Sequence, residues 1–440
     1  MELDDQRVMV IGLGVSGIAA ARFLASRGAR LIMTDQRADI IADGLPAGEL
    51  RLGAEEPRWL ADVKLVVASP GVAPASPLLR AAQSAGVPVI GEFELASRFI
   101  RAPIVAVTGT NGKSTVTTLL GEIFRRAGRK TFVGGNLGTP LVDAVDRGFE
   151  LIVAEVSSYQ LETIAQFKPR VAIHLNLTAD HLDRYRSLDE YGAAKARIFL
   201  NQSAADWAIL NRDDAQVWRL ATGLRARVLS FGRERPPSGA AVWGAGDAIA
   251  FDDGAQCGAI ALKHFRLPGH HNRLNAMAAT AAAIAMKIPP PVIEAALADF
   301  KGLPHRLEFV REHNGVAYVD DSKGTNVGAV IEALAAVAGP VVLIAGGVDK
   351  GGSYEPLRAV LAEKAKLLIL IGAAREKMQG ALAGAATIAC VETLPEAVAI
   401  AAREARAGDT VMLSPACSSF DQFKDYAERG RVFQELVGAL

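Results

Sequence analysis

The 440-residue chain carries 48 basic and 48 acidic side chains, so its formal net charge is zero, and half of its residues are hydrophobic. A chain of this length predicts two to four domains with sizeable cores. Because positive and negative charges balance, the chain has no overall excess of positive charge that would bind nucleic acid, and we expect no nucleic-acid partner. No apolar run reaches the roughly 18–20 residues of a membrane-spanning helix, so we expect no membrane partner.

The cysteines are few and widely separated. Cys257, Cys390 and Cys417 form no CxxC pair, and they are too few for a disulfide scaffold. This usage is typical of a reducing compartment. The first residues, Met1–Arg7, are polar and acidic, which does not fit a secretory signal peptide. We therefore expect a cytoplasmic protein, and a monomer by default.

The first part of the chain has the pattern of a nucleotide-binding unit. A strand is predicted at Arg7–Ile11, and the glycine-rich loop Gly12–Gly17 follows it and precedes a helix predicted at Ile18–Ser26. A second predicted strand, Arg30–Thr34, is followed by Asp35. An acidic residue at this distance from the glycines fits a Rossmann-like βαβ unit.

A phosphate-binding loop opens the second block. The strand predicted at Ile104–Val107 precedes Thr108–Thr115, which reads Thr-Gly-Thr-Asn-Gly-Lys-Ser-Thr, and a helix follows. Glycines let backbone N–H groups approach phosphate oxygens, and Lys113 supplies a charge for the β- and γ-phosphates. The hydroxyl of Ser114 is expected to ligate Mg²⁺. Val107 stands where the strict eight-residue motif has its first glycine, but the surrounding strand and helix still predict nucleoside triphosphate binding.

Two more chemical groups follow strands of this block. Glu155 ends a predicted strand that begins at Leu151, and His181 follows the strand predicted at Val171–Leu177. Ligands of open α/β sheets bind at the carboxyl ends of the strands. We therefore expect Glu155 to hold the Mg²⁺ that Ser114 contacts, and His181 to offer a neutral imidazole to the metal. The alternatives are a solvated carboxylate and a structural histidine.

The remaining elements complete a three-block chain. Between Arg227 and Leu267, short strands with turn signals predict a small antiparallel segment. Further predicted strands are Leu65–Ala68, Trp207–Leu210, Gly315–Val319, Val341–Ala345, Leu367–Ile371 and Thr410–Leu413, with helices at Asn272–Met286 and Val292–Asp299. We expect an α/β fold in three domains: a Rossmann-like domain at 1–102, a P-loop ATPase-like domain at 103–302 and a second Rossmann-like domain at 303–440.

Polar loops follow predicted strands of the third block at 321–326, 346–352 and 414–423, which predicts a shared ligand face. Arg306 is suited to neutralising a transferring phosphoryl group. Asn275 lies one turn into a predicted helix, where it either reaches an adenine edge or stays exposed behind an N-cap at Asn272. Lys195 lies on another predicted helix, and its sequence context alone indicates a solvated lysine.

These motifs resemble those of the Mur ligases, the ATP-dependent amide-bond-forming enzymes of peptidoglycan precursor synthesis. The resemblance covers nearly the whole chain and rests on motifs in family order: Thr108–Thr115, Glu155 before two serines, Asp180-His181, Ala194-Lys195, His271-Asn272, His305-Arg306 and Asp321-Ser322-Lys323. Within that family the chain looks most like the members that join glutamate to UDP-N-acetylmuramoyl-L-alanine. The segments that carry this second likeness are Gly12–Gly17, Asp35–Arg37, Ser69–Gly71, Gly134–Gly138, Asp321–Asn326, Gly346–Gly351 and Ser414–Phe423.

The resemblance implies a reaction and its cofactors. Its substrates are UDP-N-acetylmuramoyl-L-alanine, D-glutamate and ATP, and the intermediate is an acyl phosphate. Two Mg²⁺ ions and CO₂, bound as a carbamate on Lys195, are implied as cofactors. The implied catalytic residues are Lys113, Glu155, His181 and Lys195, and the implied metal ligands are Ser114, Glu155, His181 and the Lys195 carbamate.

The same resemblance implies the binding residues. Those for ATP are Gly109, Thr110, Asn111, Gly112, Lys113, Ser114, Thr115, Asn275, Arg306 and Asp321. Those for the UDP-linked substrate are Gly14, Val15, Ser16, Asp35, Gln36, Arg37, Ser69, Pro70, Gly71 and Asn136. Those for glutamate are Lys323, Thr325, Lys350, Ser419, Phe420 and Tyr426.

Other functions stay open at this point. One is a different Mur ligase or a folylpolyglutamate-type ligase, and another is the same reaction with L-glutamate. A nucleotide-gated binding module would not need Glu155, His181 and Lys195. An NAD enzyme built on Gly12–Gly17 would need a hydride-transfer site, and no downstream motif supplies one.

Overall fold

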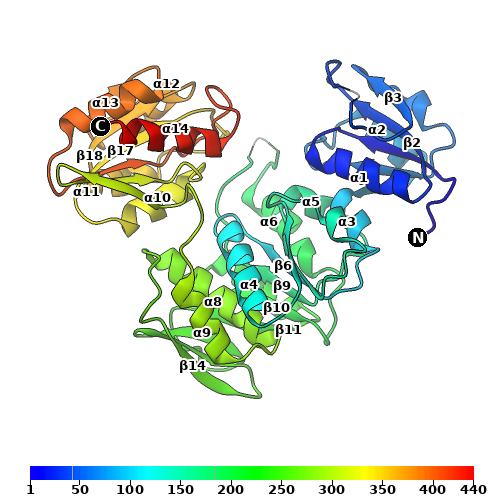
Figure 1. Ribbon diagram of the computed structural model, residues 1–440, viewed down its shortest axis with the longest axis horizontal. Coiled ribbons are helices and arrows are strands. Elements are labelled where there is room, and N and C mark those ends of the chain that lie inside the picture. The colour runs from blue at the N-terminus through cyan, green and yellow to red at the C-terminus, as the bar shows by residue number, and fades with distance from the viewer. Residues whose placement is uncertain (42, 183) are drawn as a thin grey trace.

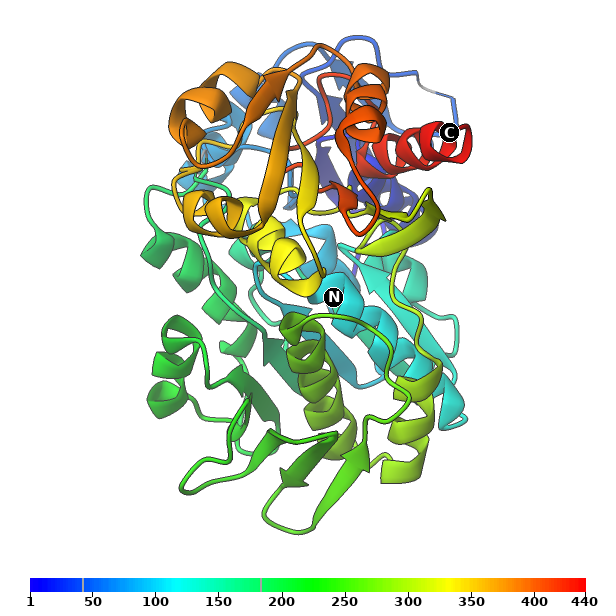
Figure 2. The same ribbon diagram turned by 90° about the vertical axis from the view of Figure 1, so that its left-hand side faces the viewer.

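The computed structural model describes residues 1–41, 43–182 and 184–440 and contains three α/β units, each with its own sheet. The predicted α/β class is confirmed. The blue N-terminal unit and the orange-to-red C-terminal unit lie on either side of the upper end of the central unit (Figure 1). Figure 2, with the C-terminal unit facing the viewer and the N-terminal unit behind it, shows both above the central unit. Among the described residues, no helix is long and apolar enough to cross a membrane.

The N-terminal unit is a parallel sheet with strand order β3-β2-β1-β4-β5. Its strands are β1 (Arg7–Ile11), β2 (Arg30–Asp35), β3 (Glu49–Leu52), β4 (Leu65–Ala68) and β5 (Val89–Gly91). Its helices are α1 (Val15–Ser26), α2 (Pro77–Ser84) and α3 (Glu92–Ser97), with a short 3₁₀ turn at Pro57–Leu60. The predicted helix at Ile18 begins earlier, at Val15, so part of the glycine-rich segment is already helical.

The central unit is a nine-stranded sheet with order β14-β13-β12-β11-β10-β9-β6-β8-β7. Its strands are β6 (Ile104–Thr108), β7 (Thr131–Gly135), β8 (Leu151–Glu155), β9 (Val171–His174), β10 (Trp207–Asn211), β11 (Arg227–Gly232), β12 (Ala241–Ala245), β13 (Ala248–Asp252) and β14 (Cys257–Ala261). Its helices are α4 (Lys113–Arg126), α5 (Ser158–Glu162), α6 (Leu188–Ala196), α7 (Ala215–Trp218), α8 (His270–Ala285) and α9 (Pro290–Asp299), with 3₁₀ turns at Leu141–Ala144, Arg197–Phe199 and Arg219–Gly223. The predicted antiparallel segment is confirmed, because β12–β13 and β13–β14 pair antiparallel at the edge.

The C-terminal unit is a six-stranded sheet with order β15-β16-β20-β17-β18-β19. Its strands are β15 (Glu308–His313), β16 (Val316–Asp320), β17 (Val341–Gly346), β18 (Ala365–Ile371), β19 (Ile388–Cys390) and β20 (Thr410–Leu413). Its helices are α10 (Val327–Ala336), α11 (Leu357–Lys364), α12 (Arg375–Leu382), α13 (Leu394–Glu404) and α14 (Tyr426–Gly438). The sheet is parallel except for the edge strand β15.

The strand pairing explains where the site lies. In β6 every residue is buried, which makes it a continuous apolar run covered on both faces. It pairs in parallel with β8 on one side and β9 on the other. The loops that follow these neighbours must therefore flank the phosphate-binding loop at one edge of the sheet.

Two further element predictions needed correction. The strand predicted at Val171–Leu177 ends at His174, because Asn176 bonds to the phosphate-binding loop instead of a strand. The helix predicted from Asn272 begins at His270 behind Gly269, so Asn272 is not the N-cap. Its Nδ2 instead donates to the carbonyl of Pro268. The short strands β3, β5, β7, β15 and β19 were not predicted.

Two buried carboxyl groups of α3 dock the N-terminal unit onto the central unit. Glu92 accepts a hydrogen bond from the Val142 amide at 2.7 Å. Glu94 accepts from the amides of residues 165–167 and forms an ion pair with Arg98. Because both side chains are buried, this contact is built into the core and does not depend on a ligand.

The raised pKa of Glu92 leads us to expect that the stability of the protein depends on pH. Burial raises the pKa of Glu92 from 4.5 to about 7. Between these values the folded chain holds more protons than the unfolded chain, so the contribution of Glu92 to the free energy of unfolding falls as pH rises. A Glu92→Gln variant, neutral throughout, should therefore be more stable than the parent at pH 8, by at most about 3 kcal/mol, and similar to it at pH 5.

Chemical denaturation at pH 5, 6, 7 and 8 measures this difference. Glu94→Gln is the control, because it weakens hydrogen bonds to three backbone amides and should destabilise over the whole range. Parallel stability curves for the parent and Glu92→Gln would contradict the prediction.

Candidate active site

The phosphate-binding loop is fixed by hydrogen bonds with Asn176 and Lys113. The side-chain Oδ1 of Asn176 accepts from the amides of Thr110 and Asn111 at 3.1 and 2.8 Å. Lys113 Nζ folds back and donates to the carbonyls of Gly109 and Thr110 at 3.0 and 2.8 Å. Burial lowers the pKa of Lys113. A phosphate oxygen offers this amine a stronger, charged acceptor than the carbonyls that it contacts here.

Gly112 shows why this loop requires glycine. Its φ is +83°, and a Cβ at this position would lie 2.3 Å from Oδ1 of Asn275. We expect Gly112→Ala to raise KM for ATP by about tenfold or more, because the clash moves both the loop and Asn275.

Steady-state kinetics measures this effect against a matched control. Gly254 has a φ of +85° with no atom within 4 Å of a built Cβ, so Gly254→Ala carries the same backbone strain without the clash. Equal effects of the two substitutions on KM for ATP would show that the clash with Asn275 does not weaken ATP binding.

Glu155 lies where a metal ion would be held. It ends β8, is 3 % exposed, and its Oε1 accepts from Asn136 Nδ2 at 2.6 Å. Its Oε2 is buried, and no described residue pairs with it. A buried carboxylate oxygen without a partner is costly, and Glu155, Ser114 and His181 line one cavity of about 210 Å³. Carboxylate and hydroxyl oxygens suit Mg²⁺, so these residues fit the ion.

Lys195 is not solvated, contrary to what its sequence context indicated. It is 1 % exposed on α6, and Nζ donates to the carbonyl of Gly109 at 2.8 Å and lies 4.5 Å from the Tyr191 ring centroid. Burial, reinforced by the nearby Lys113, holds the pKa of Lys195 well below its ordinary value. The amine therefore lies beneath the phosphate-binding loop, with a larger neutral fraction than an exposed lysine.

His181 contacts Tyr159 of α5 and packs edge-on against Tyr191 of α6. Its backbone adopts a left-handed φ of 56°, and Nδ1 lies 2.9 Å from the Tyr159 hydroxyl. Burial lowers the pKa of His181, which favours the neutral ring. Although burial opposes ionisation, Lys350 and His181 hold the pKa of Asp180 below its ordinary value.

Arg306 enters the site from the C-terminal unit. Its Nη1 lies 3.6 Å from Oδ1 of Asp321, whose Oδ2 accepts from Ser414 Oγ at 2.7 Å. Asp321 is fully buried behind Arg306, and burial raises its pKa. Asp321 was predicted to contact ATP; here it lies behind Arg306, which lines both cavities.

The C-terminal unit brings cations to the loop. Lys350 Nζ lies 3.3 Å from Thr325 Oγ1 and 3.7 Å from Oδ1 of Asp180, and Lys323 Nζ donates to the Tyr426 hydroxyl at 2.9 Å. Four of the six residues predicted to bind the glutamate substrate line the cavity that contains Glu155: Lys323, Thr325, Lys350 and Tyr426. Of the other two, Ser419 is buried and Phe420 is 73 % exposed, and neither lines this cavity.

We call this space the phosphate cavity. Its lining is Thr110, Asn111, Gly112, Lys113, Ser114, Thr115, Asn136, Glu155, Asp180, His181, Arg306, Lys323, Thr325, Asn326, Lys350 and Tyr426. A second cavity of about 470 Å³ adjoins it and shares Asn111, Gly112 and Arg306. Asn275 lines this second cavity, which is large enough for a nucleoside beside the loop.

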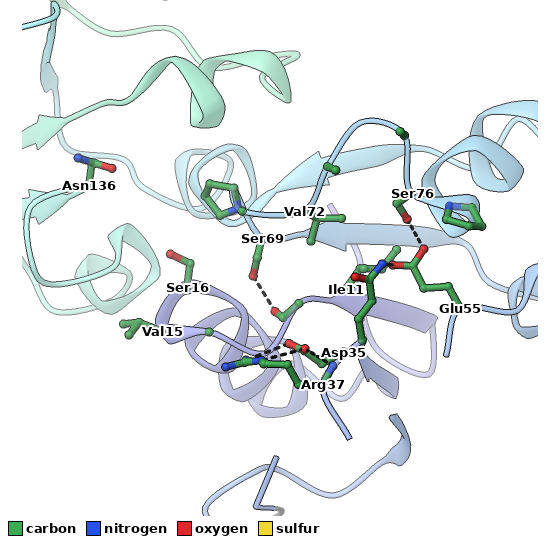
Figure 3. A pocket seen from close by; sticks show the side chains of 18 residues that line it. Ile11, Val15, Ser16, Asp35, Arg37, Glu55, Ser69, Val72, Ser76 and Asn136 are labelled. Atoms are coloured by element: carbon green, nitrogen blue, oxygen red, sulfur yellow. Dashed lines mark hydrogen bonds and ion pairs between the residues drawn. The ribbon is translucent and has the colours of Figure 1, made fainter. Parts of the chain in front are cut away.

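The N-terminal unit contains a third cavity of about 790 Å³, which we call the nucleotide cavity (Figure 3). Every residue predicted for the UDP-linked substrate lines it: Gly14, Val15, Ser16, Asp35, Gln36, Arg37, Ser69, Pro70, Gly71 and Asn136. Asp35 already accepts from the Leu13 amide and from Arg37, so it is not free for the ribose diol as in an NAD site. Asn136 also lines the phosphate cavity, so the two spaces meet at its side chain.

Two residues of the site were not predicted from the sequence. Asn176 anchors the loop amides, and Asn326 Nδ2 donates to Asn111 Oδ1 at 3.0 Å and to Asp180 Oδ2 at 3.2 Å across the two units. Asn176 and Asn326 each lie shortly after a strand, a signal that was available. Which loop each side chain bonds to depends on how the units pack.

Three family models match successive parts of the chain. They are described as "Mur ligase MurD-like, N-terminal domain" at residues 6–91, "Mur ligase middle domain" at 107–283 and "Mur ligase, glutamate ligase domain" at 305–417. The UDP-N-acetylmuramoylalanine–D-glutamate ligases of Geotalea daltonii and Geotalea uraniireducens are each 46 % identical to the chain over 100 % of its length and 99 % of theirs. The chain belongs to the Mur ligase family.

Solved structures agree in fold. A pseudomurein peptide ligase type C from Methanothermus fervidus has a TM-score of 0.63 at 19 % identity, and a UDP-N-acetylmuramate-alanine ligase from Thermotoga maritima has 0.60 at 19 %, each covering 99 % of both chains. At 19 % identity these two structures support the Mur ligase fold and nothing more specific. As a Mur ligase, the chain is an ATP-dependent enzyme that forms an amide bond and uses Mg²⁺.

Proposed function

We propose that this Mur ligase joins D-glutamate to UDP-N-acetylmuramoyl-L-alanine and converts ATP to ADP and phosphate. The observation that carries the proposal is the junction at Asn136. A nucleotide bound in the nucleotide cavity can extend its acyl end past Asn136 into the phosphate cavity, where Lys113 and Glu155 lie. The full-length similarity to D-glutamate ligases supports the choice of amino acid.

The first step is attack of the L-alanine carboxylate on the γ-phosphate of ATP, which forms an acyl phosphate and releases ADP. Lys113 and Arg306 approach the phosphate cavity from two units, and their charges stabilise the negative charge of the transferring group. Bound Mg²⁺ would supply further charge neutralisation, held by Ser114, Glu155 and His181.

Lys195 is proposed to act as a carbamate that holds a second Mg²⁺. Carbamate formation joins the neutral amine to CO₂ and releases a proton. The burial of Lys195 supports this, because it lowers the pKa of the amine. The new carboxylate would lie beside Gly109, the present partner of the amine.

The second step is attack of the glutamate amine on the acyl phosphate, with loss of phosphate from the tetrahedral intermediate. Lys323, Thr325 and Lys350 line the phosphate cavity and offer cationic and hydroxyl partners to the glutamate carboxylates. Asn326 and Lys350 also contact Asn111 and Asp180 of the central unit, so this side of the site is built by both units.

The cellular setting follows from the substrates. ATP and UDP-linked sugars are cytoplasmic metabolites, and the chain has three free cysteines among its described residues. We propose a cytoplasmic enzyme that acts as a monomer.

Phosphate release tests the proposal. The assay contains ATP, Mg²⁺ and UDP-N-acetylmuramoyl-L-alanine, with D-glutamate, L-glutamate or meso-diaminopimelate as the amino acid. Release that depends on D-glutamate is the expected result. Release with L-glutamate or meso-diaminopimelate alone would contradict the assigned amino acid, and no release with any of them would contradict the assigned nucleotide substrate.

A further inference from the structure

The loop after β4, residues 69–72, forms part of the wall of the nucleotide cavity. Ser69 and Val72 line the cavity (Figure 3), together with Pro70. Ser69 Oγ donates to the carbonyl of Gly12 at 2.6 Å, which joins this loop to the glycine-rich segment within the N-terminal unit. A contact that holds the loop from another unit therefore also sets where a bound nucleotide lies relative to the phosphate cavity.

Arg184 of the central unit makes such a contact. Its Nη1 donates to the carbonyls of Pro70 and Val72, at 3.4 Å each. Its other edge is held by Glu162, because Nε donates to Oε1 at 3.1 Å and Nη2 donates to Oε2 at 2.5 Å. The guanidinium carbon lies 4.2 Å from the Tyr159 ring centroid, and the side chain is 15 % exposed. Glu162 thus fixes one edge of the guanidinium, which leaves Nη1 for the N-terminal unit.

The residues that hold Arg184 belong to the segments that carry the proposed metal ligands. Glu162 and Tyr159 lie on α5, the helix that follows Glu155 at the end of β8. The Tyr159 hydroxyl lies 2.9 Å from Nδ1 of His181, and His181 belongs to the same loop as Arg184. Arg184 does not line the nucleotide cavity or the phosphate cavity, so it can act only through the groups that it places.

We propose that Arg184 is a positioning residue for phosphoryl transfer: it sets the offset between the nucleotide cavity and the phosphate cavity, so that the substrate carboxylate meets the γ-phosphate in line. This rests on the proposed function, which places the UDP-linked substrate in the first cavity and ATP at the phosphate-binding loop. In-line attack tolerates little misplacement, since an error of about 1 Å can cost about a hundredfold in rate. Arginine suits the role, because a lysine cannot hold a carboxylate with two nitrogens and reach two carbonyls with a third.

Arg184→Met tests the inference, because methionine still packs on Tyr159 but lacks the guanidinium. We expect kcat for D-glutamate-dependent phosphate release to fall by about tenfold or more, while Kd for UDP and KM for ATP stay within about twofold of the parent values. UDP has no acyl end, and the bond from Ser69 to Gly12 keeps its cavity intact within the N-terminal unit. Calorimetry measures UDP binding, and steady-state kinetics measures the other two quantities. Arg184→Lys should lose as much activity as Arg184→Met.

Glu162→Gln provides a second measurement on the same contact. Its amide nitrogen would oppose one of the two arginine donors, so kcat should fall here too, by less than in Arg184→Met. If Glu162 acts through Arg184, the double variant should lose no more activity than Arg184→Met alone. Losses that multiply would show that Glu162 acts by another route and would count against the inference.

Arg186→Met is the matched control. Arg186 is 94 % exposed and pairs with Glu190 at 3.9 Å, so its loss should leave kcat unchanged. Thermal unfolding of each variant verifies folding, and Glu162→Gln and Arg184→Lys carry the prediction if Arg184→Met fails to fold. The parent kcat in Arg184→Met or in Arg184→Lys would overturn the inference. So would a loss of UDP affinity as large as the loss of kcat, because Arg184 would then support only the packing of the units.

The parent protein separates this inference from the proposed function. D-glutamate-dependent release in the parent, with an unchanged kcat in Arg184→Met, would overturn only the role of Arg184. A parent protein that binds no UDP and releases no phosphate would overturn both.

Discussion

Replacing Lys113 by alanine should reduce phosphate release by at least about a thousandfold, mainly through kcat. The half-buried Lys113 amine lies in the loop beside the carbonyls of Gly109 and Thr110, close enough to Glu155 for their charges to interact. Lys113 is the cation that the central unit contributes to the lining of the phosphate cavity, among the described residues, apart from His181 when it is protonated. Loss of the amine leaves the charge of a transferring phosphoryl group without this partner, which costs most in the transition state.

Steady-state phosphate release measures the loss, and UDP binding provides an internal control. The nucleotide cavity is not lined by Lys113, so Lys113→Ala should bind UDP like the parent. Lys263 is an exposed lysine in the turn after β14, so Lys263→Ala should leave turnover unchanged. If kcat of Lys113→Ala stayed within tenfold of the parent value, the phosphate-binding loop would not take part in phosphoryl transfer as proposed.

Replacing Lys195 by alanine or by arginine should also abolish nearly all turnover, by about a thousandfold. Lys195 is buried beneath the loop, contacts Gly109 and lies close enough to Glu155 for their charges to interact, so we propose that a carboxylate formed on it reaches the metal. Arginine keeps a positive charge but cannot become the same carbamate, because its guanidinium stays protonated. The arginine variant therefore separates a carbamate from a simple cation.

Carbon-13 NMR of protein equilibrated with labelled CO₂ provides a direct readout. The parent should show a carbamate signal that Lys195→Arg lacks, and its activity should fall in CO₂-depleted buffer and return on addition of bicarbonate. An active Lys195→Arg variant, or a parent enzyme indifferent to CO₂, would show that Lys195 acts as an amine.

Local sequence determined the strand–loop–helix at 104–126 and the strand ends that carry Glu155. Short apolar runs predict the strands, and glycines mark backbone positions that other residues adopt poorly. Both signals are contained within a few residues of sequence. The rule that parallel strands present their carboxyl ends at one edge then brought Glu155 and His181 to the loop. The pairing of β6 with β8 and β9 confirms that geometry.

The tertiary structure alone decided the rest. Lys195 has the sequence context of an exposed helical lysine, and its burial and lowered pKa come from packing beneath a loop 86 residues earlier in the chain. Asn326 and Asp321 follow the same strand, yet one reaches across to Asn111 and the other is buried behind Arg306. Desolvation and contacts between units arise from surfaces distant in sequence, and no local pattern encodes which surfaces meet. The sequence therefore determined which chemical groups the site contains, and the packing of the three units determined their partners and protonation.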